Sequence, residues 1–393
     1  MTVLCTRTAT APATVEMLQG VVDVAAAEWN GLARRGFHLH AWFLAAERCG
    51  WEARHVAVRG SKRLRGIIPA YLTGANSLNN LHDRWLGPLS RVMPFAGVSL
   101  RPVISVQSPF ALVPDPLGDP AELPPVLIHR VLETLEARAE ADGAKAVAWA
   151  CVDEDNAALL QVARERGYAV LYAGASARMP VRWASFEDYV ASRSKSVRRT
   201  IKADLEAVRS AGLRTSLLSD FRAAAPAMNA LYREAFRRRN GRETLVPKGF
   251  FDELSRCPSQ GIQAQLTWSG ERLVGTSVNL GTRRLLEGTF SAFSPEHRAG
   301  PAYFNDLFYE PVRLACREGI EAIDLGATAL YAKALRGAAL RRRVILVRGT
   351  TPSRHQVIRT IGQLVARHTE WKERRALGPL WNRHLSARQE SGR

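Results

Sequence analysis

The sequence predicts an α/β fold with mixed sheets and helices on both faces, in which one arrangement of elements is used twice and a helix follows. Three observations lead to this prediction. Helical and strand-like segments alternate after an opening hairpin pattern, a second series of segments runs through a broadly similar order, and residues 353–377 form one long amphipathic pattern. We expect an N-terminal domain over 1–180, a C-terminal domain over 181–352, and a helix with a tail over 353–393 that packs on the N-terminal domain.

The first unit contains a strand pair split by the polar turn at Gly60, and the alternation of both strands is typical of a half-buried antiparallel hairpin. An irregular stretch rich in Asn, Gly and Pro over 73–100 predicts a surface loop. In order, the expected elements are strand 13–18, helices 21–34 and 38–49, strands 53–59, 64–71 and 103–113, helix 124–141, strand 146–152, helix 156–166 and strand 169–172.

The second unit opens with a basic helical pattern, one helix or a pair, that ends at Gly212. A three-strand meander follows, and then a long helical pattern from Pro301 to Gly319. The expected elements are helix 185–211, strand 213–218, helices 221–237 and 250–256, strands 263–268, 273–281 and 285–293, helix 301–319, and strands 320–325 and 343–348. In the last helix, one apolar face is expected to hold Val357, Ile361, Leu364, Val365 and His368.

The chain of 393 residues carries a formal net charge of +18. Such a charge predicts an anionic partner, such as nucleic acid, a membrane surface or a phosphorylated substrate. An Arg- and Ala-rich composition caused by a high-GC genome is the alternative. No stretch reaches the roughly 18 apolar residues of a membrane span, and the N-terminus lacks the apolar segment of a secretion signal, so we expect a cytoplasmic protein.

Neither a metal site nor a disulfide framework is expected. The five cysteines are scattered and show no C-x-x-C spacing. His38 and His40 are two positions apart, so they diverge on a helix. The spacings of a Ser–His–Asp arrangement are also absent.

A short loop between the meander and the long helix is a candidate anion cradle. Backbone N–H groups at a helix start, together with the helix dipole, attract phosphate, and Gly300 allows a ligand to approach the backbone closely. An ordinary strand-to-helix connection is the alternative. We expect the donor-binding groups at Arg298, Ala299, Gly300 and Ala302.

A second candidate is the segment Tyr331–Gly337, which follows the strand ending near Gly326. A lysine in such a Gly/Ala-rich loop reaches a phosphate or a developing oxyanion, although a solvated surface lysine is the alternative. Lys333 is therefore a candidate catalytic residue, and Arg336 a candidate donor-binding residue. The proton carrier is expected among Asp306, Tyr309 and Tyr331, with no preference between them.

Two basic runs flank these candidates and are consistent with contacts to an RNA backbone, although a solvated helix face is the usual reading of the first run. The residues concerned are Arg193, Lys195, Arg198, Arg199 and Lys202 in the first run, and Arg341, Arg342 and Arg343 in the second.

Three stretches of the chain resemble a known family. The run AYFNDLFYEPVRLACREGIEAIDLGATALYAKALRG over 302–337 resembles the closing segment of the Fem-like GNAT acyltransferases, which include FemX-type aminoacyl ligases and peptidoglycan biosynthesis/recognition proteins. The stretch SRSKSVRRTIKADLEAVRSAGLR is similar to the basic helical insertion that opens their second domain. FHLHAWFLAAERCGW and LRGIIPAYL resemble the start of their first. The resemblance implies two tandem GNAT-like domains and transfer of an acyl group to an amine.

The resemblance also implies a donor. FemX-type members use charged tRNA and other GNAT proteins use acyl-CoA, with Lys333 at the position of the family's loop lysine. Ala299 and Pro301 depart from the glycine-rich GNAT pyrophosphate signature, which favours the larger polyanion. We expect an aminoacyl-tRNA-dependent N-acyltransferase that acts on a small amine or peptide precursor, in cell-wall or specialised metabolism, as a monomer or dimer. Aminoacyl-tRNA would be a co-substrate, and no other cofactor is expected. An acyl-CoA-dependent enzyme and a non-catalytic GNAT-fold RNA or polyanion binder are the alternatives.

Overall fold

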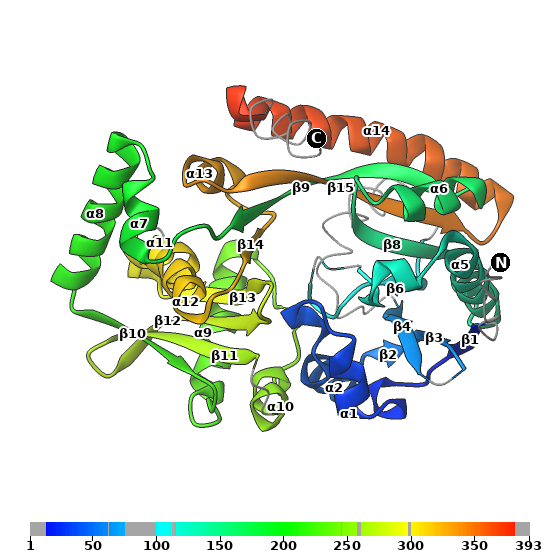
Figure 1. The fold of residues 1–393 in the computed structure, drawn as a ribbon, viewed down its shortest axis with the longest axis horizontal. Coiled ribbons are helices and arrows are strands. Elements are labelled where there is room, and N and C mark those ends of the chain that lie inside the picture. Colours follow the sequence, from blue (N-terminus) through cyan, green and yellow to red (C-terminus); the bar gives the residue numbers. More distant parts are fainter. Residues whose placement is uncertain are drawn as a thin grey trace, which may run out of the picture.

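The mixed α/β fold expected from the sequence is confirmed. The computed structural model describes residues 13–61, 63–74, 100–111, 113, 115–244, 246–257, 261–297 and 300–381, so most of the loop expected over 73–100 lies outside the described residues. An eleven-stranded sheet runs through the molecule in the order β10-β11-β12-β13-β14-β9-β15-β8-β6-β5-β2, and a second sheet has the order β1-β3-β4-β7 (Figure 1).

The N-terminal half carries the small sheet and one end of the large one (Figure 1). The parallel strands β6 and β8 are joined by helix α5, which covers the sheet. The elements are β1 (Thr14–Met17), α1 (Ala26–Gly31), α2 (His40–Arg48), β2 (Glu52–Ala53), β3 (Val56–Arg59), β4 (Leu64–Ile68), β5 (Ala70–Thr73), β6 (Val103–Val106), β7 (Leu117–Gly118), α5 (Pro125–Ala141), β8 (Ala146–Asp153), α6 (Ala157–Glu165) and β9 (Ala169–Pro180).

The C-terminal half repeats the arrangement of a meander, a helix, a parallel strand, a short helix and a last strand. The basic stretch is the helix pair α7 and α8, which Ser185 and Ser194 cap through their side chains. The elements are α7 (Phe186–Ala191), α8 (Lys195–Ser210), β10 (Leu213–Leu218), α9 (Ala225–Asn240), α10 (Phe250–Arg256), β11 (Ile262–Ser269), β12 (Arg272–Gly281), β13 (Leu286–Phe293), α11 (Pro301–Phe304), the π-helical segment η6 (Asn305–Tyr309), α12 (Glu310–Glu318), β14 (Ala322–Gly326), α13 (Leu330–Leu335) and β15 (Ala339–Gly349).

The two halves exchange their last strands. β9, the last strand of the first half, pairs with β14 of the second, whereas β15 pairs with β8 of the first half. β9 and β15 also pair with each other from Ala339↔Arg178 to Val347↔Ala169, and they run along one side of the molecule from one half to the other (Figure 1). The expected domain boundaries remain predictions, because this exchange makes each half incomplete without the other.

Helix α14 (Pro352–Leu377) lies across the exchanged strands (Figure 1). Ile358, Gly362 and Ala366 are buried against a cluster that includes Leu171 of β9 and Val347 of β15. A side-chain carbon on Gly362 would lie 2.5 Å from Leu171, so the close packing of the helix requires glycine there. The helix therefore packs on strands from both halves.

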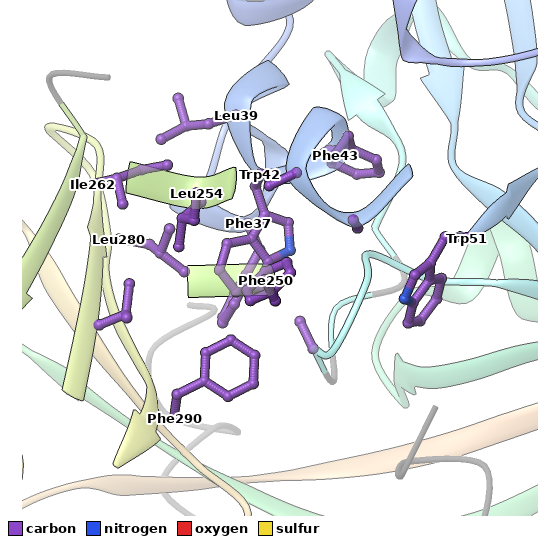
Figure 2. Close-up of a cluster of buried hydrophobic side chains, with 14 of the residues drawn as sticks. Phe37, Leu39, Trp42, Phe43, Trp51, Phe250, Leu254, Ile262, Leu280 and Phe290 are labelled. Atoms are coloured by element: carbon purple, nitrogen blue, oxygen red, sulfur yellow. The ribbon is translucent and has the colours of Figure 1, made fainter. Parts of the chain in front are cut away.

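An aromatic cluster joins the halves from the other side. The Trp42 ring stacks on Phe290 of β13 and meets Phe250 of α10 edge to face, and Figure 2 shows these rings converging from both halves. The indole N–H of Trp42 donates to the carbonyl oxygen of Pro109 over 2.8 Å. These rings belong to one buried apolar cluster with residues from both halves, so the two halves pack against each other.

Several element predictions were wrong in extent. β9 and β15 are longer than predicted, since their small and alternating polar residues pair with each other. The long helix is interrupted by η6, and the expected loop at Tyr331–Gly337 contains helix α13. Strand 64–71 is broken at Pro69, and its second part joins the large sheet. In α14, Leu364 is 61% exposed and His368 is exposed, so neither belongs to the buried face.

Candidate functional site

A cavity of about 550 Å³ opens in the C-terminal half where two parallel strands part. β13 and β14 pair through Leu286↔Ile323 and Glu287↔Asp324, and no further pairing between them is formed in the described residues. Beyond this point the cavity is lined by β13, by the segment Ile323–Thr328 and by side chains of α9 and η6. Ligands of α/β proteins commonly bind where the carboxyl ends of parallel strands diverge.

Asp306 lies on the wall of this cavity. Its carboxylate accepts hydrogen bonds from Thr267 Oγ1 at 2.5 Å, Asn305 Nδ2 at 3.2 Å and Thr215 Oγ1 at 3.3 Å. The side chain is almost fully buried, and burial raises the pKa of Asp306 to about 6, against the opposing effect of these hydrogen bonds. A carboxyl with such a pKa exchanges protons near neutral pH.

A chain of amide side chains fixes the backbone of Asp306. Asn279 Nδ2 donates to Gln265 Oε1 over 3.0 Å, and Gln265 Nε2 donates to the carbonyl oxygen of Asp306 over 2.8 Å. A carbon on Gly275 would lie 3.0 Å from Asp306 Oδ2, so the glycine leaves room for the carboxylate. π-Helical turns such as the one that contains Asp306 are frequent at functional sites.

Lys333 also lines the cavity, from helix α13. Its ammonium group donates to the carbonyl oxygen of Leu325, at the end of β14. This contact holds the side chain beside the segment that closes the cavity. An ammonium carries three N–H donors and a full charge, which suits it to a phosphate or a developing oxyanion.

Strained backbone lies at the same place. Phe110 and Phe290 line the cavity with φ of 53° and 52°, and Ala329, beside the lining residue Thr328, has φ of 50°. Phe290 belongs to a β-bulge, because β12 and β13 shift register between Thr276 and Val278. Left-handed φ at residues other than glycine is unfavourable and clusters at functional sites.

Tyr309 and Arg336 have a different environment from the one expected. The Tyr309 hydroxyl donates to Asp204 of α8 over 2.5 Å, and the buried Arg336 guanidinium lies 3.6 Å from the same carboxylate. Arg336 also covers the ring of Phe304 at 4.0 Å. The two residues join α8 to α13 and η6, so they hold the basic helix in place beside the cavity.

The other residues predicted around the donor are spread more widely. Tyr331 is 53% exposed on α13. Gly300 and Ala302 are not among the described residues that line the cavity. Tyr303, which follows them in α11, does line it. Arg298 and Ala299 lie outside the described residues. The structure thus brings Lys333 and Asp306 together in one cavity.

The two basic runs differ in accessibility. In α8, Lys195, Arg199 and Lys202 are exposed, whereas Arg198 donates to backbone carbonyls of the preceding turn. Arg193, which precedes α8, donates to the carbonyl oxygen of Arg336. In β15, Arg341 and Arg343 pair with Asp153, and Arg342 pairs with Glu154 and Glu370. The guanidinium groups of Arg341–Arg343 already have carboxylate partners, so these residues are poorly placed to contact an RNA backbone.

Sequence analysis missed Arg238, Arg239 and Tyr303, which line the cavity. The sequence could have indicated the two arginines, because Arg237–Arg239 place three cations in the last turn of α9. One cation is enough to interact favourably with the dipole at a helix C-terminus, so a run of three points to an additional role.

An ion-pair cluster borders the cavity, which its members Glu287 and Asp324 line. Arg35 of the N-terminal half reaches Asp115 at 2.5 Å, Glu287 at 2.6 Å and Asp324 at 2.8 Å, the last two from the paired ends of β13 and β14. Burial opposes the charge, but the three carboxylates outweigh it and raise the pKa of Arg35. One guanidinium therefore ties the N-terminal half to the point where the strands part.

Comparison with known proteins assigns the family. A family described as peptidoglycan biosynthesis/recognition, FemAB-like, matches residues 20–370. The chain belongs to the FemAB-like family. The expected resemblance to Fem-like GNAT proteins is thereby confirmed. No curated protein sequence matches this FemAB-like chain.

Solved structures confirm the tandem GNAT-like fold. FemX is 12% identical with a TM-score of 0.57, covering 88% of this chain and all of FemX. The C-terminal domain (DUF2156) of a putative lysylphosphatidylglycerol synthetase from Agrobacterium fabrum is 12% identical with a TM-score of 0.52, covering 83% of this chain and 91% of that one. A tandem GNAT protein from the clavulanic acid biosynthesis pathway is 13% identical with a TM-score of 0.50, covering 87% of this chain and 99% of that one. At these identities the likeness is one of fold. Together with the family, it supports a function of the acyltransferase type.

Within the described residues, none of the helices combines the length and apolar character needed to cross a bilayer.

Proposed function

We propose that the protein is an N-acyltransferase that takes an aminoacyl group from charged tRNA and joins it by an amide bond to the amine of a small molecule or peptide precursor. One observation carries the proposal: the cavity between the parting strands is lined both by a buried carboxyl with a raised pKa, Asp306, and by a lysine, Lys333. Amide formation from an ester needs a proton acceptor and a positive group near the developing oxyanion.

In the proposed reaction, the acceptor amine attacks the ester carbonyl carbon and a C–N bond forms. The ester C–O bond then breaks, and the tRNA leaves with its terminal hydroxyl protonated. Asp306 accepts the proton that the amine loses, and Lys333 stabilises the oxyanion. Holding the donor and the acceptor together in the cavity supplies much of the acceleration. We prefer Asp306 as the base because the hydroxyl of Tyr309 is engaged with Asp204 and the Tyr331 side chain is largely exposed.

The preference for tRNA over a smaller donor rests on charge. Lys195, Arg199 and Lys202 are exposed on α8, and α8 packs against α11, which leads into the cavity wall. Arg239 adds positive charge to the cavity itself, and Arg238, which also pairs with Glu234 at 3.5 Å, lines it as well. A polynucleotide whose end enters the cavity and whose backbone follows α8 would use both sets of cations.

An acyl-CoA-dependent N-acyltransferase is the second candidate, since a cavity between parting strands also accommodates a thioester arm. A donor assay separates the two. The protein is incubated with charged tRNA or acyl-CoA and a panel of amines, with and without ribonuclease, and new amides are detected by mass spectrometry. We expect an amide from charged tRNA that ribonuclease abolishes. A product that needs CoA and survives ribonuclease would establish the second candidate, and no product from either donor would support a non-catalytic binder.

A further inference from the structure

A second cavity, of about 460 Å³, is lined mainly by the N-terminal half, and the C-terminal half contributes Arg284, Leu285, Glu321 and Arg343. Helix α5, the end of β8 and the start of α6 supply residues of its wall, among them Val131, Trp149 and Leu159. In the order of elements that the two halves share, α5 corresponds to α11–α12, β8 to β14 and α6 to α13. The three C-terminal elements line or flank the C-terminal cavity. Each half therefore holds a cavity at the corresponding place, and the function proposed above uses the C-terminal one.

One side of this second cavity is apolar. Leu123, Val131, Trp149 and Leu159 are all buried and line it together with Ile128. An apolar wall of this kind offers few partners to water, so a ligand gains free energy by placing an apolar body against it.

The lining also includes an arginine that has no partner among the described residues. Arg178 of β9 lines the cavity, and among the residues that the structure describes no carboxylate lies within 4 Å of its guanidinium and no hydrogen bond engages it. Burial, and then the charges of Arg341 and Arg35, lower the pKa of Arg178. A half-buried cation in this position is stabilised by an added anion, because the anion replaces lost hydration and offsets the repulsion.

The charge of the whole lining has the same sign. Among the described residues, five arginines and three carboxylates line the cavity, so these lining residues carry a net charge of +2, although Arg35 also pairs with Glu287 and Asp324 outside the lining. His38 does not change this, because burial lowers its pKa to about 3 and keeps it neutral. Both ring nitrogens of the buried His38 also lack a hydrogen-bond partner among the described residues, so the ring offers one donor and one acceptor to a ligand.

We propose that this N-terminal cavity is a second ligand site, and that its ligand is a small amphiphilic anion. The oxyanion, a carboxylate or a phosphate, pairs with Arg178, and the apolar body lies along α5 and Trp149. His38 hydrogen-bonds the polar part. This site stands apart from the acyl transfer proposed for the C-terminal cavity, since none of its defining residues is Lys333 or Asp306.

Isothermal titration calorimetry on the full chain tests the site with four probes: phenyl phosphate, 3-phenylpropanoate, the neutral 3-phenylpropanol and inorganic phosphate. We expect at least one aryl anion to bind about tenfold or more tightly than the alcohol and than inorganic phosphate. The tighter of the two aryl anions identifies the oxyanion. Absence of saturable binding by both aryl anions in the millimolar range would overturn the proposal.

Variants locate the binding. Arg178→Gln is expected to weaken the aryl anion about tenfold or more, and Arg178→Lys to weaken it less, because the charge remains. Arg182→Gln, an exposed arginine on the same segment, is the matched control and should leave the affinity unchanged. Lys333→Ala should also leave it unchanged. Loss of binding in Lys333→Ala with retention in Arg178→Gln would place the anion in the other cavity and refute the assignment. Thermal unfolding confirms that each variant is folded.

Discussion

The hydroxyl of Thr267 donates a hydrogen bond of 2.5 Å to Oδ2 of Asp306; both side chains are buried, and Asp306 lines the C-terminal cavity. The bond stabilises the charged form of the carboxyl, whereas burial disfavours it, and burial is the larger effect on the pKa. The result is a carboxyl that titrates near pH 6, held in a fixed orientation.

The activity should therefore depend on pH through Asp306. The carboxylate is the proton acceptor, so the rate of amide formation should fall as the pH falls through about 6. Asp306→Asn should lose roughly 10²–10⁴ of the rate, the usual contribution of a positioned base. The measurement is a pH–rate profile under conditions where chemistry limits turnover. A profile without an acidic limb near 6, or an Asn variant with full activity, would exclude Asp306 as the base.

Stability should change with pH in the opposite sense to activity. The folded pKa of Asp306 lies above its ordinary value of 3.8, so the folded state binds the proton more tightly than the unfolded state. This group therefore stabilises the fold most at low pH, and its contribution is lost as the pH rises from about 4 to about 6. Asp306→Asn should be more stable than the wild type at pH 8, by on the order of 1–3 kcal/mol. Urea unfolding at pH 5 and 8 measures the difference, and equal differences at the two pH values would contradict the raised pKa.

Removing the Thr267 hydroxyl should move the acidic limb. Thr267→Val deletes the hydrogen bond that favours the carboxylate, so the pKa of Asp306 should rise further and activity at pH 7 should fall more than activity at pH 8.5. Thr215→Val is the matched control, because its hydroxyl contacts the same carboxyl at 3.3 Å and should shift the limb less. The two pH–rate profiles are compared directly. A larger shift from Thr215→Val would mean that the shorter bond does not dominate.

The exposed cations of α8 should set the affinity for tRNA. Replacing Lys195, Arg199 and Lys202 by Gln should weaken binding and reduce the slope of log affinity against log salt by about 2–3. The same change at Arg222, Arg256 and Arg317, which are 67%, 63% and 61% exposed elsewhere, serves as the control. Filter binding at several salt concentrations provides both quantities. If the two triple variants lose affinity equally, α8 has no special role.

Arg35 should be essential for the stability of the joined halves. Arg35→Met leaves Glu287, Asp324 and Asp115 without their shared cation, and an unpaired buried charge costs about 3–5 kcal/mol. Denaturant unfolding measures the loss. Adding Glu287→Gln to Arg35→Met should recover part of it, because one of the stranded carboxylates is then neutral. A double variant less stable than Arg35→Met would show that Glu287 does not depend on Arg35.

The sequence predicted the fold better than the site. Period-2 and period-3.6 patterns identified most elements, because each has one face in a core. The exchange of β9 and β15 was not predictable from such patterns, since pairing partners are chosen by packing between segments far apart in the chain. Lys333 was found because it follows a strand in a small-residue segment. Arg35 was missed because its carboxylate partners Glu287 and Asp324 lie more than 250 residues away in the chain. Arg178 was missed because its place at a cavity depends on how distant segments pack, which no local pattern of the sequence reveals.

Formation of an amide from charged tRNA by site variants tests the central claim most directly. We expect a ribonuclease-sensitive amide product from the wild type and from Tyr331→Phe, and its loss in both Asp306→Asn and Lys333→Ala, with tRNA affinity measured alongside. Full product formation by Asp306→Asn and Lys333→Ala would show that the cavity between β13 and β14 is not where the acyl group is transferred.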